Sequence, residues 1–168
     1  MTHAERHRIQ EIATFLIKHA HQLDYPRNDV RGERDAETWR LTWEEAKDLL
    51  ERGGRLQFDC SQSSTQIFRW AKVGDPNGLD YKHAGYTGTM LAHLRDHYTD
   101  PRRADVGALV VFGPGTGEHV AVVIARDHRH GDPALFSHGA QYTAGPIRLS
   151  VERLYHHRPV TFLSVAGL

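Results

Sequence analysis

The sequence predicts an α+β domain, in which helices come first and a mainly antiparallel sheet follows. Apolar residues recur with helical spacing up to about residue 97, whereas short apolar runs separated by turn residues follow residue 104. Segregation of helices and strands along a chain is typical of the α+β class. The 168 residues are enough for one domain with its own core, and no repeat, low-complexity tract or linker divides them.

Capping residues and apolar stripes mark the helices of the first part. Ile9 and Leu16 share one stripe of an amphipathic helix. Thr42 and Glu45 match a capping box, and Asp59 is a good N-cap for the helix that follows it. The expected helices cover residues 4–23, 42 to about 53, 60–73 and 88–97, with a long polar loop over 24–41.

The second part is predicted to form a sheet of short strands. The apolar run 108–112 and the glycine-rich turn 114–117 delimit its first strand. The loop 126–133 is polar and short enough for a hairpin between the strands on either side of it. The expected strands cover residues 106–112, 119–125, 134–138, 147–149 and 160–165.

Composition excludes several classes of protein. Lys plus Arg equals Asp plus Glu at 21 each, and the resulting zero net charge argues against a dedicated nucleic-acid binder. A single cysteine excludes an intramolecular disulfide and any zinc site built on two or four cysteines. No apolar run approaches the roughly 18 residues of a membrane span, and residues 1–8 lack the apolar core of a signal peptide. We therefore expect a chain made in the cytoplasm, with no membrane or nucleic-acid partner.

Cys60, the only cysteine, lies in the tripeptide Asp59-Cys60-Ser61 at the expected start of a helix. Unpaired N–H groups and the positive end of the helix dipole stabilise a thiolate there, and those N–H groups would form part of an oxyanion hole. The alternative is that a lone cysteine is a small buried hydrophobic residue. Position alone does not decide between a nucleophile and a core residue.

Two histidines provide the partners that a cysteine nucleophile needs. His119 starts one apolar strand and His138 ends the next, and the centre of the hairpin falls near residues 128–130. Antiparallel pairing then brings both histidines to the same end of the sheet. We expect His119 to be the base that takes the Cys60 proton and His138 to fix the His119 tautomer. The alternative is that both are surface residues at strand ends with local hydrogen bonds.

These residues resemble the NlpC-type cysteine peptidases, papain-like enzymes that cut bacterial cell-wall peptides. The nucleophile motif is Asp59-Cys60-Ser61, the base opens the strand His119-Val120-Ala121-Val122, and the third polar residue is His138. More specifically, the chain resembles the peptidase domains of lysins from phages of actinobacteria. The segments that carry this second resemblance are 74–79, 85–89, 113–120 and 137–139, within residues 58–149.

The resemblance implies a papain-like fold in which residues 1–168 form a single peptidase domain. An N-terminal helical part over 1–57 would precede a catalytic core over 58–168. The implied activity is that of an endolysin-type endopeptidase, which cleaves an amide bond in the peptidoglycan stem peptide through Cys60, His119, His138 and a thioester intermediate. Such an enzyme needs no metal and no cofactor. The enzyme would reach the cell wall by holin-type release or by lysis, and we expect it to be a monomer.

Further site residues follow from the same resemblance. Many relatives place a tyrosine before the nucleophile with its hydroxyl toward the oxyanion, and Tyr25 is the candidate; the alternative is an ordinary half-buried loop tyrosine. Ser61 and Asp59, beside the nucleophile, are assigned to oxyanion or substrate binding. Tyr86, in a glycine-flanked segment, is expected to line the substrate groove, or else to belong to a turn that starts a helix. Gln62 stands where a small residue is common in the family, and we expect it to change the groove beside the nucleophile.

Three other functions stay open on the sequence alone. The same residues suit an N-acetylmuramoyl-L-alanine amidase, which cuts the link between sugar and peptide. A non-catalytic phage structural or binding module with a papain-like fold would carry Cys60 as an inert thiol. A histidine-based metalloprotein would use the histidines His128, His130, His156 and His157. No acidic partner of these histidines has helical ligand spacing, so we expect no metal site.

Overall fold

The computed structural model describes residues 1–26, 38–83, 85–126, 133–139, 145–154 and 158–168. Helices occupy the first part of the chain and a five-stranded antiparallel sheet occupies the second, so the predicted α+β class is confirmed. The helices, with η for 3-10 turns, are α1 (His3–Lys18), η1 (Ala20–Gln22), α3 (Trp43–Glu51), α4 (Cys60–Ala71), α5 (Thr87–His93) and η2 (Val151–Leu154). The strands are β1 (Leu23–Asp24), β2 (Leu56–Gln57), β3 (Leu109–Phe112), β4 (His119–Ala125), β5 (Ala134–Ser137), β6 (Ile147–Ser150) and β7 (Val160–Leu163).

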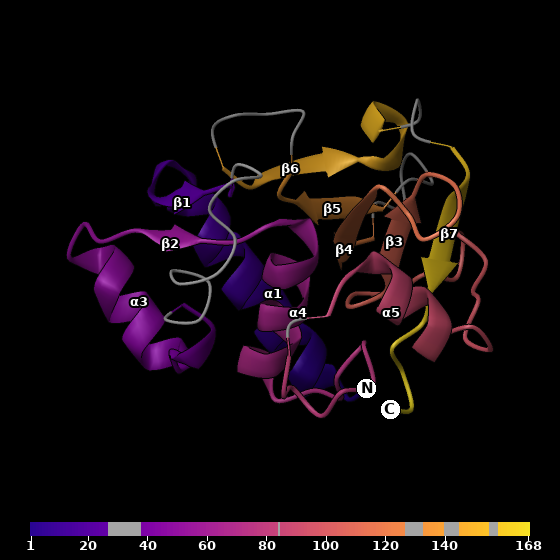
Figure 1. Ribbon diagram of the computed structural model, residues 1–168, viewed down its shortest axis with the longest axis horizontal. Coiled ribbons are helices and arrows are strands. Elements are labelled where there is room, and N and C mark those ends of the chain that lie inside the picture. The colour runs from indigo at the N-terminus through magenta and orange to yellow at the C-terminus, as the bar shows by residue number, and fades with distance from the viewer. Residues whose placement is uncertain (27–37, 84, 127–132, 140–144, 155–157) are drawn as a thin grey trace.

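The sheet has the strand order β6-β5-β4-β3-β7, and each neighbouring pair is antiparallel (Figure 1). The central strand β4 is buried along almost its whole length, because helices cover one face and a second apolar cluster covers the other. Its run of β-branched residues suits a strand that is covered on both faces. The predicted strand 119–125 matches β4 in both bounds.

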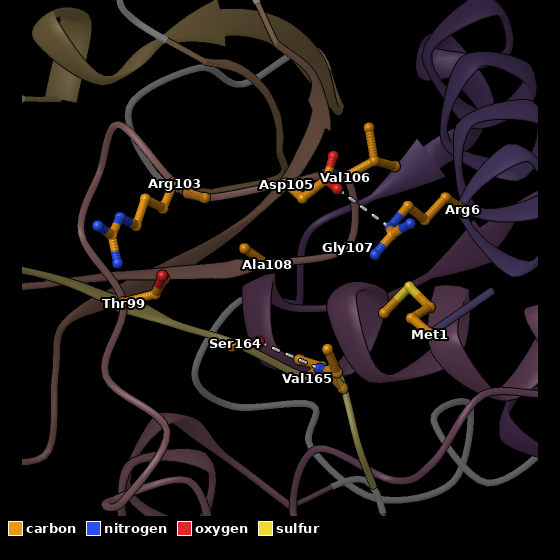
Figure 2. Close-up of a pocket in the computed structure, with 12 residues that line it drawn as sticks. Met1, Arg6, Thr99, Arg103, Asp105, Val106, Gly107, Ala108, Ser164 and Val165 are labelled. Atoms are coloured by element: carbon orange, nitrogen blue, oxygen red, sulfur yellow. Dashed lines mark hydrogen bonds and ion pairs between the residues drawn. The ribbon is translucent and has the colours of Figure 1, made fainter. Parts of the chain in front are cut away.

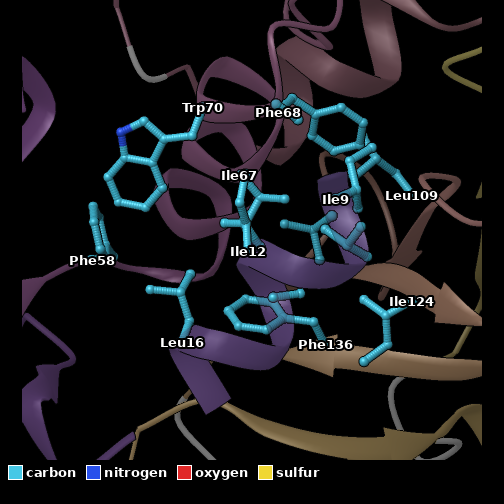
Figure 3. Packing of buried hydrophobic residues seen from close by; sticks show 14 of the residues in the cluster. Ile9, Ile12, Leu16, Phe58, Ile67, Phe68, Trp70, Leu109, Ile124 and Phe136 are labelled. Atoms are coloured by element: carbon cyan, nitrogen blue, oxygen red, sulfur yellow. The ribbon is translucent and has the colours of Figure 1, made fainter. Parts of the chain in front are cut away.

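The helices α1 and α4 pack on each other and on β4, and their apolar faces form the main core (Figures 1 and 3). In α1, Ile9, Ile12 and Leu16 are buried, as the predicted stripe requires. From α4, Ile67 and Phe68 are buried in the same cluster. Full burial of one such side chain contributes roughly 1.5–3 kcal/mol, so this layer fixes α4 against the sheet.

Both capping predictions for the middle of the chain are confirmed. Thr42 caps α3 and Asp59 caps α4, each through a capping box. The helix α1 ends at Lys18, before the predicted residue 23, because the chain continues into η1 and then into a strand. The apolar stripe therefore extends past the end of the α-helix itself.

The short strands β1 and β2 were not predicted, and they bring two distant segments together near the candidate site. They pair in parallel, with Asp24 opposite Gln57. The backbone N–H of Phe58 donates to the carbonyl oxygen of Asp24 at 3.0 Å, which extends the pairing by one residue. This pairing brings Tyr25, the residue after β1, to the segment that leads into Cys60.

One carboxylate holds the turn that follows α4. Asp75 Oδ1 accepts the backbone N–H of Asn77 at 2.9 Å, and Oδ2 accepts those of Leu79 and Tyr81 at 3.0 and 2.9 Å. Asp75 is only 9% exposed, so water does not readily replace it as an acceptor. Asp75 therefore sets the course of the chain between α4 and α5.

Asp75→Ala is expected to lower the free energy of unfolding by about 3 kcal/mol, because backbone N–H groups in a buried turn lose a charged acceptor. Asp100→Ala is the matched control: its carboxylate is exposed and accepts one backbone N–H, from Arg102 at 2.7 Å. A loss below about 1 kcal/mol is expected there. Urea unfolding followed by circular dichroism measures both. Equal losses in the two variants would show that Asp75 does not hold the turn.

Candidate functional site

Cys60 is the first residue of α4, as predicted, and Asp59 is the N-cap of that helix. Asp59 Oδ1 accepts the backbone N–H of Gln62 at 2.8 Å and the hydroxyl of Ser61 at 2.7 Å. Gln62 Oε1 in turn accepts the backbone N–H of Asp59 at 2.8 Å, which completes the capping box. Gln62, which departs from the resembled family, therefore stabilises the helix start that carries Cys60.

The Cys60 thiol is buried and is surrounded by hydrogen-bonding groups. They include the hydroxyl of Tyr25 and the backbone N–H groups of Ser61 and Val120. Val120 directly follows His119 in β4. The sulfur therefore lies against the backbone at the start of β4, next to the residue predicted to be the base.

Burial raises the pKa of the Cys60 thiol above its ordinary value, and the negative charge of Asp59 raises it further. The N–H groups of Val120 and Ser61 and the hydroxyl of Tyr25 lower the pKa, but their effects are smaller. The N–H of Ser61 at the helix start lowers the pKa, as expected, but the burial of a thiol that is only 7% exposed has the larger effect.

Tyr25 is half-buried and lies beside both Cys60 and His138. Burial raises the pKa of its hydroxyl far above the ordinary value, so the hydroxyl stays protonated and is able to donate. Its ring meets the ring of His138 edge-on, with centroids 5.4 Å apart. A hydroxyl donor beside the sulfur is compatible with the role at the oxyanion that the resemblance implies.

His119 is buried at the start of β4, with neighbours that differ from those expected. Its Nε2 lies 2.8 Å from the hydroxyl oxygen of Ser137, and its ring centroid lies 6.0 Å from that of Phe112. A Cβ added to Gly139 would lie 2.5 Å from Cε1 and 2.7 Å from Nδ1 of His119, so only glycine leaves room for the ring. Ser137 and Gly139 were not assigned to the site from the sequence.

His138 is 1% exposed, and neither ring nitrogen has a hydrogen-bond partner among the described residues. Burial lowers the pKa of the ring to about 4, although the charges of Asp59 and Asp24 act in the opposite direction. The ring is therefore neutral at pH 7. The expected hydrogen bond from His138 to His119 is not formed, and Ser137 occupies that position instead.

The register of β4 and β5 explains why the two histidines have different neighbours. Ala121 lies opposite Ser137, so continuing the register places His119 opposite Gly139. The prediction that the two histidines meet at one end of the sheet is confirmed. Because side chains alternate along a strand, Ser137 lies on the same side of the sheet as His119, and His138 points to the other side.

Tyr86 is 53% exposed and is the N-cap residue of α5. Its backbone N–H donates to Thr89 Oγ1 at 2.9 Å. The alternative that this segment is a turn that starts a helix is therefore confirmed. The described contacts of Tyr86 do not include Cys60 or His119.

A cavity of about 210 Å³ lies at the opposite end of the sheet (Figure 2). Its lining includes Arg103 and Asp105, which precede β3, and Ser164, which follows β7. Arg6 of α1 lies on one side and forms an ion pair with Asp105, with Nε and Oδ2 3.3 Å apart. None of the predicted site residues lines this cavity, so it is separate from the thiol.

Comparisons of the chain with protein-family models, with curated proteins and with solved structures found no match. The described residues contain no group of three or more His, Cys, Asp or Glu side chains that could hold a metal ion. The histidines His128, His130, His156 and His157 lie outside the described residues. No helix in the described part of the chain combines the length and the apolar character needed to cross a bilayer.

The buried neutral ring of His138 predicts a loss of stability in acid. Its pKa is about 4 in the folded chain and 6.5 as the ordinary value, so below pH 6.5 the unfolded chain binds a proton that the folded chain does not. Stability therefore falls as the pH drops from 6.5 toward 4. By pH 4.5, protonation of this one group in the unfolded chain is expected to lower the free energy of unfolding by about 2 kcal/mol.

His138→Phe keeps a ring of similar size and removes the titration. Urea unfolding of the native chain and of this variant, at pH 7 and at pH 4.5, isolates the effect from that of the carboxylates. We expect the native chain to lose about 2 kcal/mol more than the variant between the two pH values. An equal loss of unfolding free energy in both chains between pH 7 and pH 4.5 would contradict a buried, neutral His138.

Proposed function

We propose that this chain is a papain-like cysteine peptidase that hydrolyses peptidoglycan as an endolysin-type endopeptidase, cutting an amide bond of the stem peptide. The observation that carries the proposal is the surroundings of Cys60, where a phenol hydroxyl and backbone N–H groups gather at a thiol on a helix start. A cysteine that serves only as a core residue has no need of such partners. The packing of α4 against β4 supports the papain-like interpretation of the α+β fold.

In the proposed reaction, Cys60 Sγ attacks the amide carbonyl carbon and its proton passes to the imidazole of His119. Because burial keeps the thiol protonated, the proton moves as the C–S bond forms and not before. The carbonyl oxygen becomes an oxyanion. The N–H groups at the start of α4 and the hydroxyl of Tyr25 stabilise that charge.

His119 then donates the proton to the nitrogen of the leaving amine, and the C–N bond breaks to leave a thioester on Cys60. A water molecule gives a proton to His119 and attacks the thioester carbonyl carbon. Cleavage of the C–S bond releases the new carboxyl group, and the thiolate takes back the proton from His119. The thiol is thereby restored for the next cycle.

Cys60→Ala is expected to abolish release of peptides from purified peptidoglycan without lowering the melting temperature. His119→Ala is expected to slow release by roughly 10²–10⁴-fold, because the base is lost. His7→Ala, at an exposed position on α1, is the control and keeps the native rate. Mass spectrometry of the digest identifies the bond: new termini within the stem peptide support the endopeptidase, and free L-alanine N-termini support the amidase. Full activity of Cys60→Ala would contradict both.

One observation favours a second candidate, a non-catalytic binding module with the same fold. Burial raises the pKa of Cys60, and a protonated, buried thiol is what an inert cysteine would also show. Such a module would sediment with purified peptidoglycan and release no peptide. Peptide release by the native chain separates the candidates: a peptidase releases peptides that Cys60→Ala does not, whereas a binding module binds peptidoglycan and releases none with either chain.

A further inference from the structure

The hydroxyl of Ser137 is a fixed hydrogen-bonding partner for His119. It lies 2.8 Å from Nε2, and the two residues are only 3% and 4% exposed. The backbone of Ser137 pairs with Ala121 of β4 on one side and with Ile147 of β6 on the other. Because strands on both sides hold Ser137, its hydroxyl has little freedom to follow a moving ring.

Two further contacts confine the ring of His119. Phe112, at the end of β3, lies beside it at an angle of 33° between the ring planes. Gly139 approaches so closely that a Cβ there would overlap the Nδ1–Cε1 edge. With these two sides occupied, the hydrogen bond between Nε2 and Ser137 keeps that nitrogen facing β5.

We propose that Ser137, and not His138, is the positioning residue that orients His119. The hydroxyl oxygen accepts the Nε2–H, so the neutral ring carries its proton on Nε2 and its lone pair on Nδ1. Nδ1 is then the atom that takes the proton from Cys60. The inference rests on the proposed function for that step, whereas the hydrogen bond itself is a property of the chain without substrate.

His138 lies in an environment that differs from that of His119. Neither of its nitrogens has a partner among the described residues, and its ring contacts Tyr25. The hydroxyl of Ser137 therefore has the role toward His119 that the resemblance assigns to His138. An oxygen acceptor for Nε2–H is sufficient for it, since the third group in such a site holds the tautomer and stabilises the imidazolium.

Nitrogen-15 NMR of the imidazole rings tests the hydrogen bond without any need for activity. The His119 signals are assigned by their absence in His119→Ala. We expect His119 of the native chain in the Nε2–H tautomer, a mixture of both tautomers in Ser137→Ala, and recovery in Ser137→Thr, which keeps the hydroxyl. An unchanged tautomer in Ser137→Ala overturns the proposal.

Kinetics on purified peptidoglycan provide the second readout. Ser137→Ala is expected to lower kcat/KM by about ten- to a hundred-fold, mainly through kcat, because the base is no longer held in one orientation. Ser137→Thr should recover most of this, and His138→Phe should lose less than Ser137→Ala. A larger loss in His138→Phe, with its fold intact, overturns the proposal. If the native chain hydrolyses no peptidoglycan but its His119 tautomer still changes in Ser137→Ala, the proposed function is wrong, whereas the role of Ser137 in orienting His119 is supported.

Discussion

The packing of α4 against α1 and β4 is the constraint on which the site depends. Burial of Ile67 and Phe68 fixes the helix axis against the sheet, and the helix start is then forced against the first residues of β4. Cys60 lies at that start, so its sulfur meets the backbone N–H of Val120. The same packing that positions the thiol removes water from it.

Loss of water gives the site its chemical character. Burial is the main influence on the pKa of Cys60, Tyr25 and His138, and in each case it favours the uncharged form. Asp59, the carboxylate next to Cys60 in the chain, is engaged in capping α4. For the proposed peptidase, each hydrogen bond to a developing oxyanion would be stronger in such surroundings than in water. In the proposed reaction the proton of Cys60 would leave during the attack, so the orientation of His119 would control the rate.

Local signals in the sequence were sufficient for the start of α4 and for both bounds of β4, because a capping residue and a β-branched run mark them. The strands β1 and β2 have two residues each, too few for a periodic pattern, so the approach of Tyr25 to Cys60 was not derivable from pairing. Ser137 was missed because a shift of one residue in register exchanges its face with that of His138. The raised pKa of the thiol was not predicted because helix position is visible in a sequence and burial is not.

In the proposed reaction an acyl group of the substrate passes through Cys60, and trapping with hydroxylamine detects that acyl group. Hydroxylamine attacks a thioester carbonyl carbon and releases the acyl group as a hydroxamate, in competition with water. We expect digests of purified peptidoglycan made with the native chain to contain stem-peptide hydroxamates, whose share grows with hydroxylamine concentration at the expense of free carboxyl termini. Digests that contain only free carboxyl termini at every hydroxylamine concentration would contradict the proposed reaction, because water would then attack the amide without a thioester.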